Sequence, residues 1–151
     1  MATTTTAGTT LRVSLTAPGT LDLAGYTTLY PSMNVAGNIT DMGEYDRVYE
    51  IITTIPLDTR RKQKRKGSYD EGSMSLVLNI DPADVGQNDL RTQSKVDANA
   101  YIAITHQDGT VDFFEALIMS ASKVVGGADN MYTSNVQMEI NSDIIESPEI
   151  V

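Results

Sequence analysis

Alternation of apolar and polar residues is the clearest pattern in the last third of the chain. Segments 99–106 and 110–122 both alternate, and they flank the tripeptide Gln107, Asp108 and Gly109. An Asp-Gly pair between two alternating segments is typical of a β-hairpin. A third alternating segment, 131–141, follows a glycine-containing turn at 126–130. Because a strand places successive side chains on opposite faces, the pattern predicts three antiparallel strands with one buried face.

The first half of the chain contains weaker strand patterns. They predict extended segments at 10–15, 26–31, 44–55 and 73–80. Gly37, Asn38 and Gly43 indicate a loop over 34–43. We expect the segments 44–55 and 73–80 to form a hairpin, joined by an unusually long loop over residues 57–72.

Only one segment predicts a helix, about residues 82–97. Asp81 is a suitable N-cap, Pro82 suits the first helical position, and Asp84 complements the positive end of the helix dipole. A thin apolar stripe contains Val85, Leu90 and Val96. The predicted fold is therefore mainly β, a β-sandwich or set of antiparallel sheets with one short flanking α-helix. We expect a single domain over 1–151, with a flexible N-terminal arm at 1–9 and an acidic tail at 142–151 that is not ordered by itself.

Composition excludes several classes of function. The chain of 151 residues has no cysteine and a single histidine, so thiolate chemistry and a multi-histidine metal site are ruled out within one chain. His106 is expected to be an exposed residue at the shoulder of a hairpin, because no spacing proposes a catalytic triad. No phosphate-binding glycine motif is present. We expect no enzyme activity, no metal and no cofactor.

Membrane association is not expected from the sequence. No apolar run approaches the length of a transmembrane helix. The N-terminus begins with threonine, alanine and glycine rather than with the charged and apolar regions of a signal peptide.

The charge of the chain is divided unevenly. The net charge is −9, but six of the eleven basic residues fall within seven positions. Without this block, five basic residues remain against 20 acidic ones, a net charge of −15. The basic block is either a solvated loop or a surface that docks on acid, supplied by a partner or by another copy. Its members are Arg60, Arg61, Lys62, Lys64, Arg65 and Lys66.

The order of these elements, together with two short motifs, resembles the tail tube (major tail) proteins of long-tailed, non-contractile bacteriophages. The first motif is the helix-opening segment 81–90, and the second is the hairpin segment 107–114. The similarity extends over roughly residues 45–141. It implies that the chain forms hexameric rings that stack into a tube, in which sheets from all subunits line a channel for DNA and the tape-measure protein.

The resemblance also implies partners and a location. The expected partners are further copies of the chain, the tail terminator and the tail tip proteins, and the expected location is the virion tail, assembled in the cytoplasm of the bacterial host. By position, loop 57–72 would bridge successive rings through its basic block.

The resemblance implies an acidic channel wall, which would let DNA slide because a wall of like charge offers no cations to the phosphates. Either polar strand face satisfies the alternation, so both remain candidates for the wall. The candidates are Ser73, Ser75, Asn79, Asn135, Gln137, Glu139, Glu44, Asp46 and Glu50.

Other functions remain open at this point. Within the same setting, the chain could be a contractile-tail or secretion-system tube protein, or a tail terminator. Outside it, a monomeric β-sandwich binding or decoration module is the alternative. The absence of tryptophan and the placement of most Tyr and Phe within strands count against sugar binding.

Overall fold

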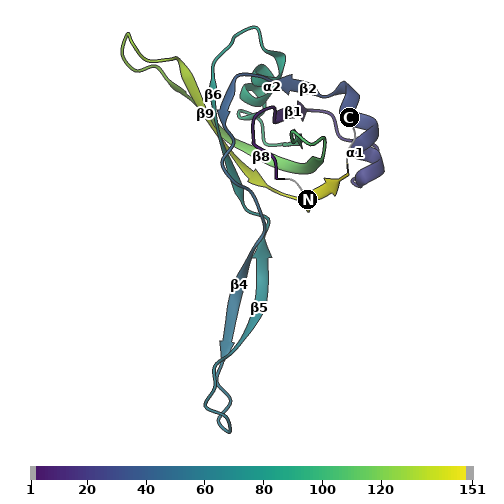
Figure 1. Ribbon diagram of the computed structural model, residues 1–151, viewed down its shortest axis with the longest axis vertical. Coiled ribbons are helices and arrows are strands. Elements are labelled where there is room, and N and C mark those ends of the chain that lie inside the picture. Colours follow the sequence, from purple (N-terminus) through teal and green to yellow (C-terminus); the bar gives the residue numbers. More distant parts are fainter. Residues whose placement is uncertain (1–2, 149–151) are drawn as a thin grey trace.

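The main sheet is antiparallel and curls around the larger of two hydrophobic cores (Figure 1). The computed structural model describes residues 3–148. Eight strands form the sheet in the order β2-β1-β7-β8-β9-β6-β3, with β10 pairing along β8. The strands are β1 (Thr10–Ser14), β2 (Asn34–Ala36), β3 (Ile39–Asp41), β6 (Ser73–Asn79), β7 (Asn99–Thr105), β8 (Val111–Val124), β9 (Thr133–Ile140) and β10 (Ile145–Ser147). The predicted mainly β fold is confirmed.

The hairpins of the last third form as predicted. β7 pairs with β8 from Asn99 opposite Leu117 to Thr105 opposite Val111, and β8 then pairs with β9. Gly109 closes the first turn at φ 93°, a conformation that suits glycine. The apolar residues of β9 point into the core and its polar residues point to solvent. Alternation was therefore a reliable signal in this region.

β7 and the first half of β8 are buried on both faces, which the sequence pattern did not reveal. One face, with Ile102 and Phe114, belongs to the larger core. The other face, with Phe113, belongs to a smaller core that is covered by α1 (Leu23–Leu29) and the 3₁₀ turn η1 (Tyr30–Ser32). The extended segment predicted at 26–31 is therefore wrong.

Tertiary packing explains this first helix. Asp22 caps it by accepting a hydrogen bond from the Gly25 amide at 2.9 Å. Tyr26 and Tyr30, four residues apart, both lie against Phe113, with ring centroids 5.1 and 6.1 Å from the Phe113 ring. A seven-residue helix is marginal by itself, so this aromatic contact decides the conformation.

The loop predicted at 34–43 is wrong in part, because it contains β2 and β3. β2 pairs with β1, and β3 pairs irregularly with β6. Each strand has only three residues, too few to show alternation.

The predicted helix at 82–97 exists in a shorter form, α2 (Val85–Gln93). Its N-cap is Asp84, which accepts a hydrogen bond from the Gln87 amide at 3.1 Å. Asp81, the predicted cap, instead accepts a hydrogen bond from the Ala83 amide in the preceding turn. The chain offers two acidic residues three positions apart, and only the packing of the helix selects between them.

The buried face of α2 is partly polar. Val85 and Val96 are exposed, so the predicted apolar stripe is wrong apart from Leu90. Gln87 is buried, and its amide nitrogen donates to the carbonyl oxygens of Gly37 at 2.7 Å and Asn79 at 3.0 Å. Gln87 thereby satisfies backbone groups that the short strands leave unpaired.

β4 (Val48–Thr54) and β5 (Gln63–Asp70) form a separate two-stranded hairpin, here called the ribbon, which projects away from the body (Figure 1). The predicted long loop over 57–72 is therefore wrong, because half of it is strand β5. The predicted pairing of 44–55 with 73–80 is also wrong, since β6 pairs with β9 and β3. Like charges fit in β5 because alternate side chains point to opposite faces of the ribbon.

The two chain ends differ from the expectation at one point. Ile145 to Ser147 form strand β10 on β8, so the tail predicted at 142–151 is ordered over these residues, while 149–151 lie outside the described part. In the arm predicted at 1–9, residues 1–2 lie outside it as well. Residues 3–9 are described, and the Thr5 hydroxyl lies 3.4 Å from the Gln107 side chain.

Candidate functional site: a basic ribbon and a polar sheet face

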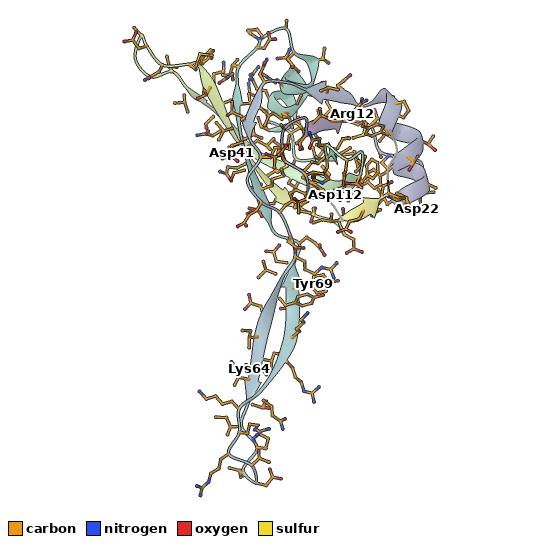
Figure 2. All side chains as sticks on the ribbon, in the orientation of Figure 1. Arg12, Asp22, Asp41, Lys64, Tyr69 and Asp112 are labelled. Carbon is orange, nitrogen blue, oxygen red and sulfur yellow. The ribbon has the colours of Figure 1, made fainter. Side chains whose placement is uncertain are left out.

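The basic block lies on the outer half of the ribbon. Arg60, Arg61 and Lys62 belong to the connection between the strands, and the other three basic residues belong to β5. All six are exposed, and Figure 2 shows side chains such as Lys64 standing free along the ribbon. Within residues 3–148, none of the six lies within ion-pair distance of a carboxylate. Their charge is therefore available to another molecule.

The same ribbon exposes apolar side chains beside these cations. β4 supplies Ile51 and Ile52, which lie opposite Lys66 and Arg65 and are 72% and 51% exposed. Leu57 near the tip is 98% exposed. A two-stranded ribbon with apolar residues in water is marginally stable alone. The surface has the composition of a protein contact, with cations around exposed apolar residues.

The structure brings the two alternative polar faces together into one. β6 and β9 are neighbours in the sheet, with Ser73 opposite Glu139 and Ser75 opposite Gln137. Asn135 lies on the same face, opposite Val77. These polar residues are exposed, whereas the residues between them are buried in the core. The two strands therefore contribute their polar residues to one surface.

Strand β8 extends this polar face. Ser120 lies opposite Gln137, and Ser122 lies opposite Asn135. Lys123 faces the other side, opposite Ser134. Among the described residues of β6, β8 and β9 that face the same side as Gln137, none is Lys or Arg. The face is thus a wall made mainly of hydroxyls and amides, with a carboxylate at Glu139 and the apolar residues Val77 and Val124 among them.

The acidic candidates gather where this wall meets the ribbon. A cleft of about 570 Å³ is lined by residues of the β3–β4 connection, the base of the ribbon, and the adjoining ends of β6 and β9. Five of the predicted residues line it, and Asp70 of β5, which sequence reasoning missed, adds a further carboxylate. The five are Glu44, Asp46, Glu50, Ser73 and Glu139. Asn79 lies at the opposite end of β6, where it pairs with Thr133.

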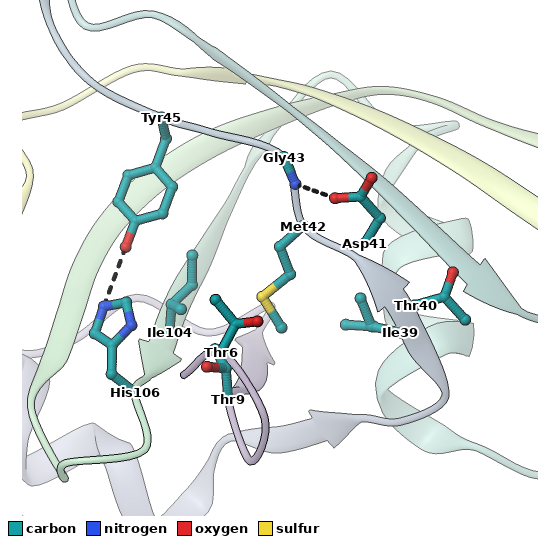
Figure 3. Close-up of a pocket in the computed structure, with 10 residues that line it drawn as sticks. All are labelled: Thr6, Thr9, Ile39, Thr40, Asp41, Met42, Gly43, Tyr45, Ile104 and His106. Atoms are coloured by element: carbon teal, nitrogen blue, oxygen red, sulfur yellow. Dashed lines mark hydrogen bonds between the residues drawn. The ribbon is translucent and has the colours of Figure 1, made fainter. Parts of the chain in front are cut away.

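His106 lies at the shoulder of the β7–β8 hairpin, as expected, but it is half-buried rather than exposed and is tied into a polar cluster. Its Nε2 atom is 2.9 Å from Oδ2 of Asp112, and the same oxygen accepts a hydrogen bond from the Tyr45 hydroxyl. Tyr45 and His106 line one end of a shallow pocket of about 240 Å³ (Figure 3). Burial, followed by the bond to Asp112, raises the pKa of Tyr45 well above its usual range. The cluster fastens the segment before the ribbon to the body.

Within residues 3–148, no three His, Asp or Glu side chains come together in a way that could hold a metal ion. None of the helices in that range has both the length and the apolar character needed to cross a lipid bilayer.

Solved structures of low sequence identity share this fold along almost the whole chain. A chain in the structure of the anti-feeding prophage baseplate is 10% identical, with a TM-score of 0.70, and the match covers 99% of both chains. A chain in the sheath/tube terminator of an extracellular contractile injection system is 10% identical, with a TM-score of 0.67 and coverage of 98% and 99%. A chain of a gene transfer agent virion is 11% identical, with a TM-score of 0.66 and coverage of 91% of this chain and 95% of that one. At these identities the similarity shows the fold alone.

The sequence itself also matches a family model. No curated protein matches the chain. The model described as lambda phage tail tube protein, however, matches residues 35–143. This range contains the ribbon, the polar wall and all candidate residues. The chain therefore belongs to the lambda phage tail tube protein family, which is structural and non-enzymatic, as the resemblance in its sequence indicated.

Proposed function

We propose that the chain forms hexameric rings that stack into the tube of a phage tail, through which DNA passes into the host. The observation that carries this proposal is the polar wall of β6, β8 and β9, which is exposed, regular and without cations. Proteins that hold DNA do so mainly through Lys and Arg on phosphates. A wall of Ser, Asn, Gln and Glu offers DNA no such contact, so the wall suits a passage in which DNA slides.

Ring closure has a structural basis in the free edge of β8. Residues 111–117 pair with β7, but residues 118–124 have β9 on one side and, among the described residues, no strand on the other. At the far end of the sheet, β3 leaves a second short edge. Pairing β8 of one subunit with the β3 edge of the next would continue the wall from subunit to subunit, because free edges accept further strands.

Ring stacking would use the basic ribbon. The six cations project away from the body, and the rest of the chain has a net charge of −15. The acidic cleft at the ribbon base offers Glu44, Glu50 and Asp70 to an approaching copy. Such a head-to-tail contact joins unlike surfaces and therefore propagates. Its strength should fall with salt, since the Debye length is about 8 Å at physiological ionic strength.

The remaining partners follow from this arrangement. DNA and the tape-measure protein would occupy the channel without sequence-specific contacts, and terminator and tip proteins would bind the two ends of the tube. The chain would be assembled in the bacterial cytoplasm and would end up in the virion tail.

Negative-stain electron microscopy over a series of protein and salt concentrations tests the proposal. We expect hollow filaments or discs with six-fold class averages, which become shorter as salt rises. A monomer at high protein concentration and low salt would contradict the proposal and would favour a monomeric binding or decoration module.

A tube or terminator protein of a contractile system is the second candidate. The observation in its favour is the whole-chain similarity of fold to a chain of a sheath/tube terminator. A terminator would form single rings that never elongate and would cap preformed tubes. Elongation of the purified chain alone would exclude the terminator role.

A further inference from the structure

Arg47 occupies the point at which the chain leaves the body and enters the ribbon. Its guanidinium group contacts three separate parts of the molecule. Nε and Nη2 lie 3.0 and 2.9 Å from Oε1 of Glu71, which follows β5. Nη2 also lies 2.8 Å from Oδ1 of Asp143, in the segment between β9 and β10. Nη1 donates to the Tyr49 hydroxyl at 3.1 Å. One side chain thus joins both strands of the ribbon to the C-terminal segment.

Aromatic rings complete this contact. Tyr49 and Tyr69 face each other across the ribbon, with ring centroids 5.3 Å apart. The Arg47 guanidinium carbon lies 4.2 Å from the Tyr69 ring centroid, and Lys66 Nζ lies 4.5 Å from that of Tyr49. A planar guanidinium can stack on a ring and bind carboxylates in its plane at once, which an ammonium group cannot do.

Glu71 makes this arrangement depend on Arg47. Its side chain is 12% exposed, and within the described residues its second oxygen, Oε2, is buried without a hydrogen-bond partner. A buried carboxylate that loses its only cation is strongly destabilised. Without Arg47, Glu71 would have to turn toward solvent, and the base of the ribbon would rearrange.

Because the ribbon is long, a small rotation at its base moves its far end considerably. The ribbon joins the body through the segments on either side of it, where Gly72, at φ 93°, lies so close to Asp46 that a side chain would collide with the Asp46 carbonyl oxygen. β4 has seven residues, a length of about 23 Å at 3.3 Å per residue. A rotation of about 10° at the base would therefore move the far end of β4 by about 4 Å at that rise per residue.

We propose that Arg47 is a positioning residue that fixes the direction of the ribbon, and that through Asp143 it couples this direction to the pairing of β10 on β8. β10 consists of three residues, starting two positions after Asp143, and is among the shortest strands of the sheet. If β10 leaves β8, Asp143 moves with it and the ribbon loses one of its two ionic anchors. The C-terminal segment would thus determine whether the ribbon keeps a single orientation relative to the body.

The distance between the ribbon tip and the body tests the positioning role. Because the chain has no cysteine, Asp58→Cys and Asp129→Cys provide two unique sites for spin labels, one at the tip and one in the β8–β9 turn. In dilute monomer, double electron–electron resonance should give a single narrow distance population. Arg47→Gln should replace it by a broad distribution, and Arg47→Lys should restore it only in part.

Arg12→Gln is the matched control. Arg12 also stacks on a tyrosine, 4.4 Å from the Tyr30 ring centroid, but it lies in the body. We expect the Arg12→Gln variant to have a lower melting temperature than the wild type and an equally narrow distance distribution. The positioning role would be overturned if the distance distribution of Arg47→Gln were as narrow as that of the wild type. It would also be overturned if the distribution of Arg12→Gln were as broad as that of Arg47→Gln.

Asp143→Asn tests the coupling to β10. It should broaden the distance distribution, and combination with Arg47→Gln should add nothing further, because both changes remove the same contact. In Arg47→Gln, the amides of residues 145–147 should exchange with solvent faster than in the wild type. Unchanged exchange, or additive broadening in the double variant, would overturn the coupling. These measurements use monomer, so their result is independent of whether the chain forms tubes.

Discussion

Ser75 on β6 lies directly opposite Gln137 on β9, and its hydroxyl donates a 2.8 Å hydrogen bond to the Gln137 side-chain oxygen. This bond joins the two rows of polar residues that the sequence had presented as alternatives. Since Gln137 also lies opposite Ser120 of β8, it stands at the centre of the wall. A change of charge at this position should therefore affect what passes along the wall more than it affects the fold.

Gln137→Lys should give the wall affinity for DNA. We expect assembly as in the wild type, because the side chain is exposed, but retention of short duplex DNA by the assembled tubes at low salt. Thr28→Lys, on the exposed side of α1, is the control and should bind less DNA despite the same charge change. Equal retention by both variants would mean that position 137 does not face the channel. Filter binding over a salt series measures the difference.

Neutralising the ribbon should stop stacking without unfolding the body. Replacement of Arg60, Arg61, Lys62 and Lys64 by Ser should change the free energy of unfolding by only about 0.5 kcal/mol, as is usual for exposed sites. Tubes should fail to elongate in electron micrographs. Tubes of normal length would show that these charges do not hold rings together.

A matched pair of double variants tests whether the position of the removed positive charges matters or only their number. Lys62→Ser with Lys64→Ser should shorten tubes at moderate salt, whereas Lys95→Ser with Lys123→Ser removes two exposed cations elsewhere and should not. If the wild-type monomer retarded duplex DNA on gels at low salt, the ribbon would instead be a DNA-binding element.

Stability should fall in alkaline solution as the tyrosines that the fold protects begin to ionise. Burial first, and then the hydrogen bond to Asp112, raise the pKa of Tyr45, and burial likewise raises that of Tyr26. In the unfolded chain tyrosine ionises near pH 10. The contribution of these two tyrosines to the free energy of unfolding is therefore complete below about pH 10. It is lost as the pH rises above that value, because the tyrosine hydroxyl then ionises only in the unfolded state.

Tyr45→Phe should reduce this alkaline loss in part. It keeps the ring beside Phe114, 5.8 Å away between centroids, but it removes the bond to Asp112 and should cost about 1 kcal/mol at neutral pH. Urea unfolding between pH 7 and 11 measures both effects, with Tyr132→Phe, an exposed site, as the control. This account would be contradicted if the free energy of unfolding of Tyr45→Phe fell with alkaline pH as steeply as that of the wild type.

Gly86→Ala should destabilise the protein although alanine favours helices. A Cβ atom at Gly86 would collide with the backbone of Val35 and Ala36 in β2, so α2 could not lie as close to the sheet. We expect a loss of about 2 kcal/mol, in the range of overpacked cores. Gly127→Ala is the control, because its Cβ atom would approach only the Asn130 side chain, at 3.9 Å. Stabilisation by Gly86→Ala would mean that helix propensity dominates at this position.

The sequence by itself determined the strands whose two faces meet different surroundings. β9 was predictable because a core on one side and solvent on the other impose alternation, and the Asp-Gly turn fixed the β7–β8 hairpin. The basic block was equally visible, because charge is a property of composition. The family resemblance rested on the order of these elements.

Only the tertiary structure decided the elements whose conformation depends on distant partners. α1 forms because Tyr26 and Tyr30 pack on Phe113, more than eighty residues later, and the choice of Asp84 as the cap of α2 depends on how that helix meets β2. Strand β5 of the ribbon escaped prediction because both faces of the ribbon are exposed, so no buried side imposes a pattern on it. The polar wall required the pairing of β6 with β9, a contact between segments about sixty residues apart. Alternation shows that a strand has two faces, but only strand pairing decides which faces form one surface.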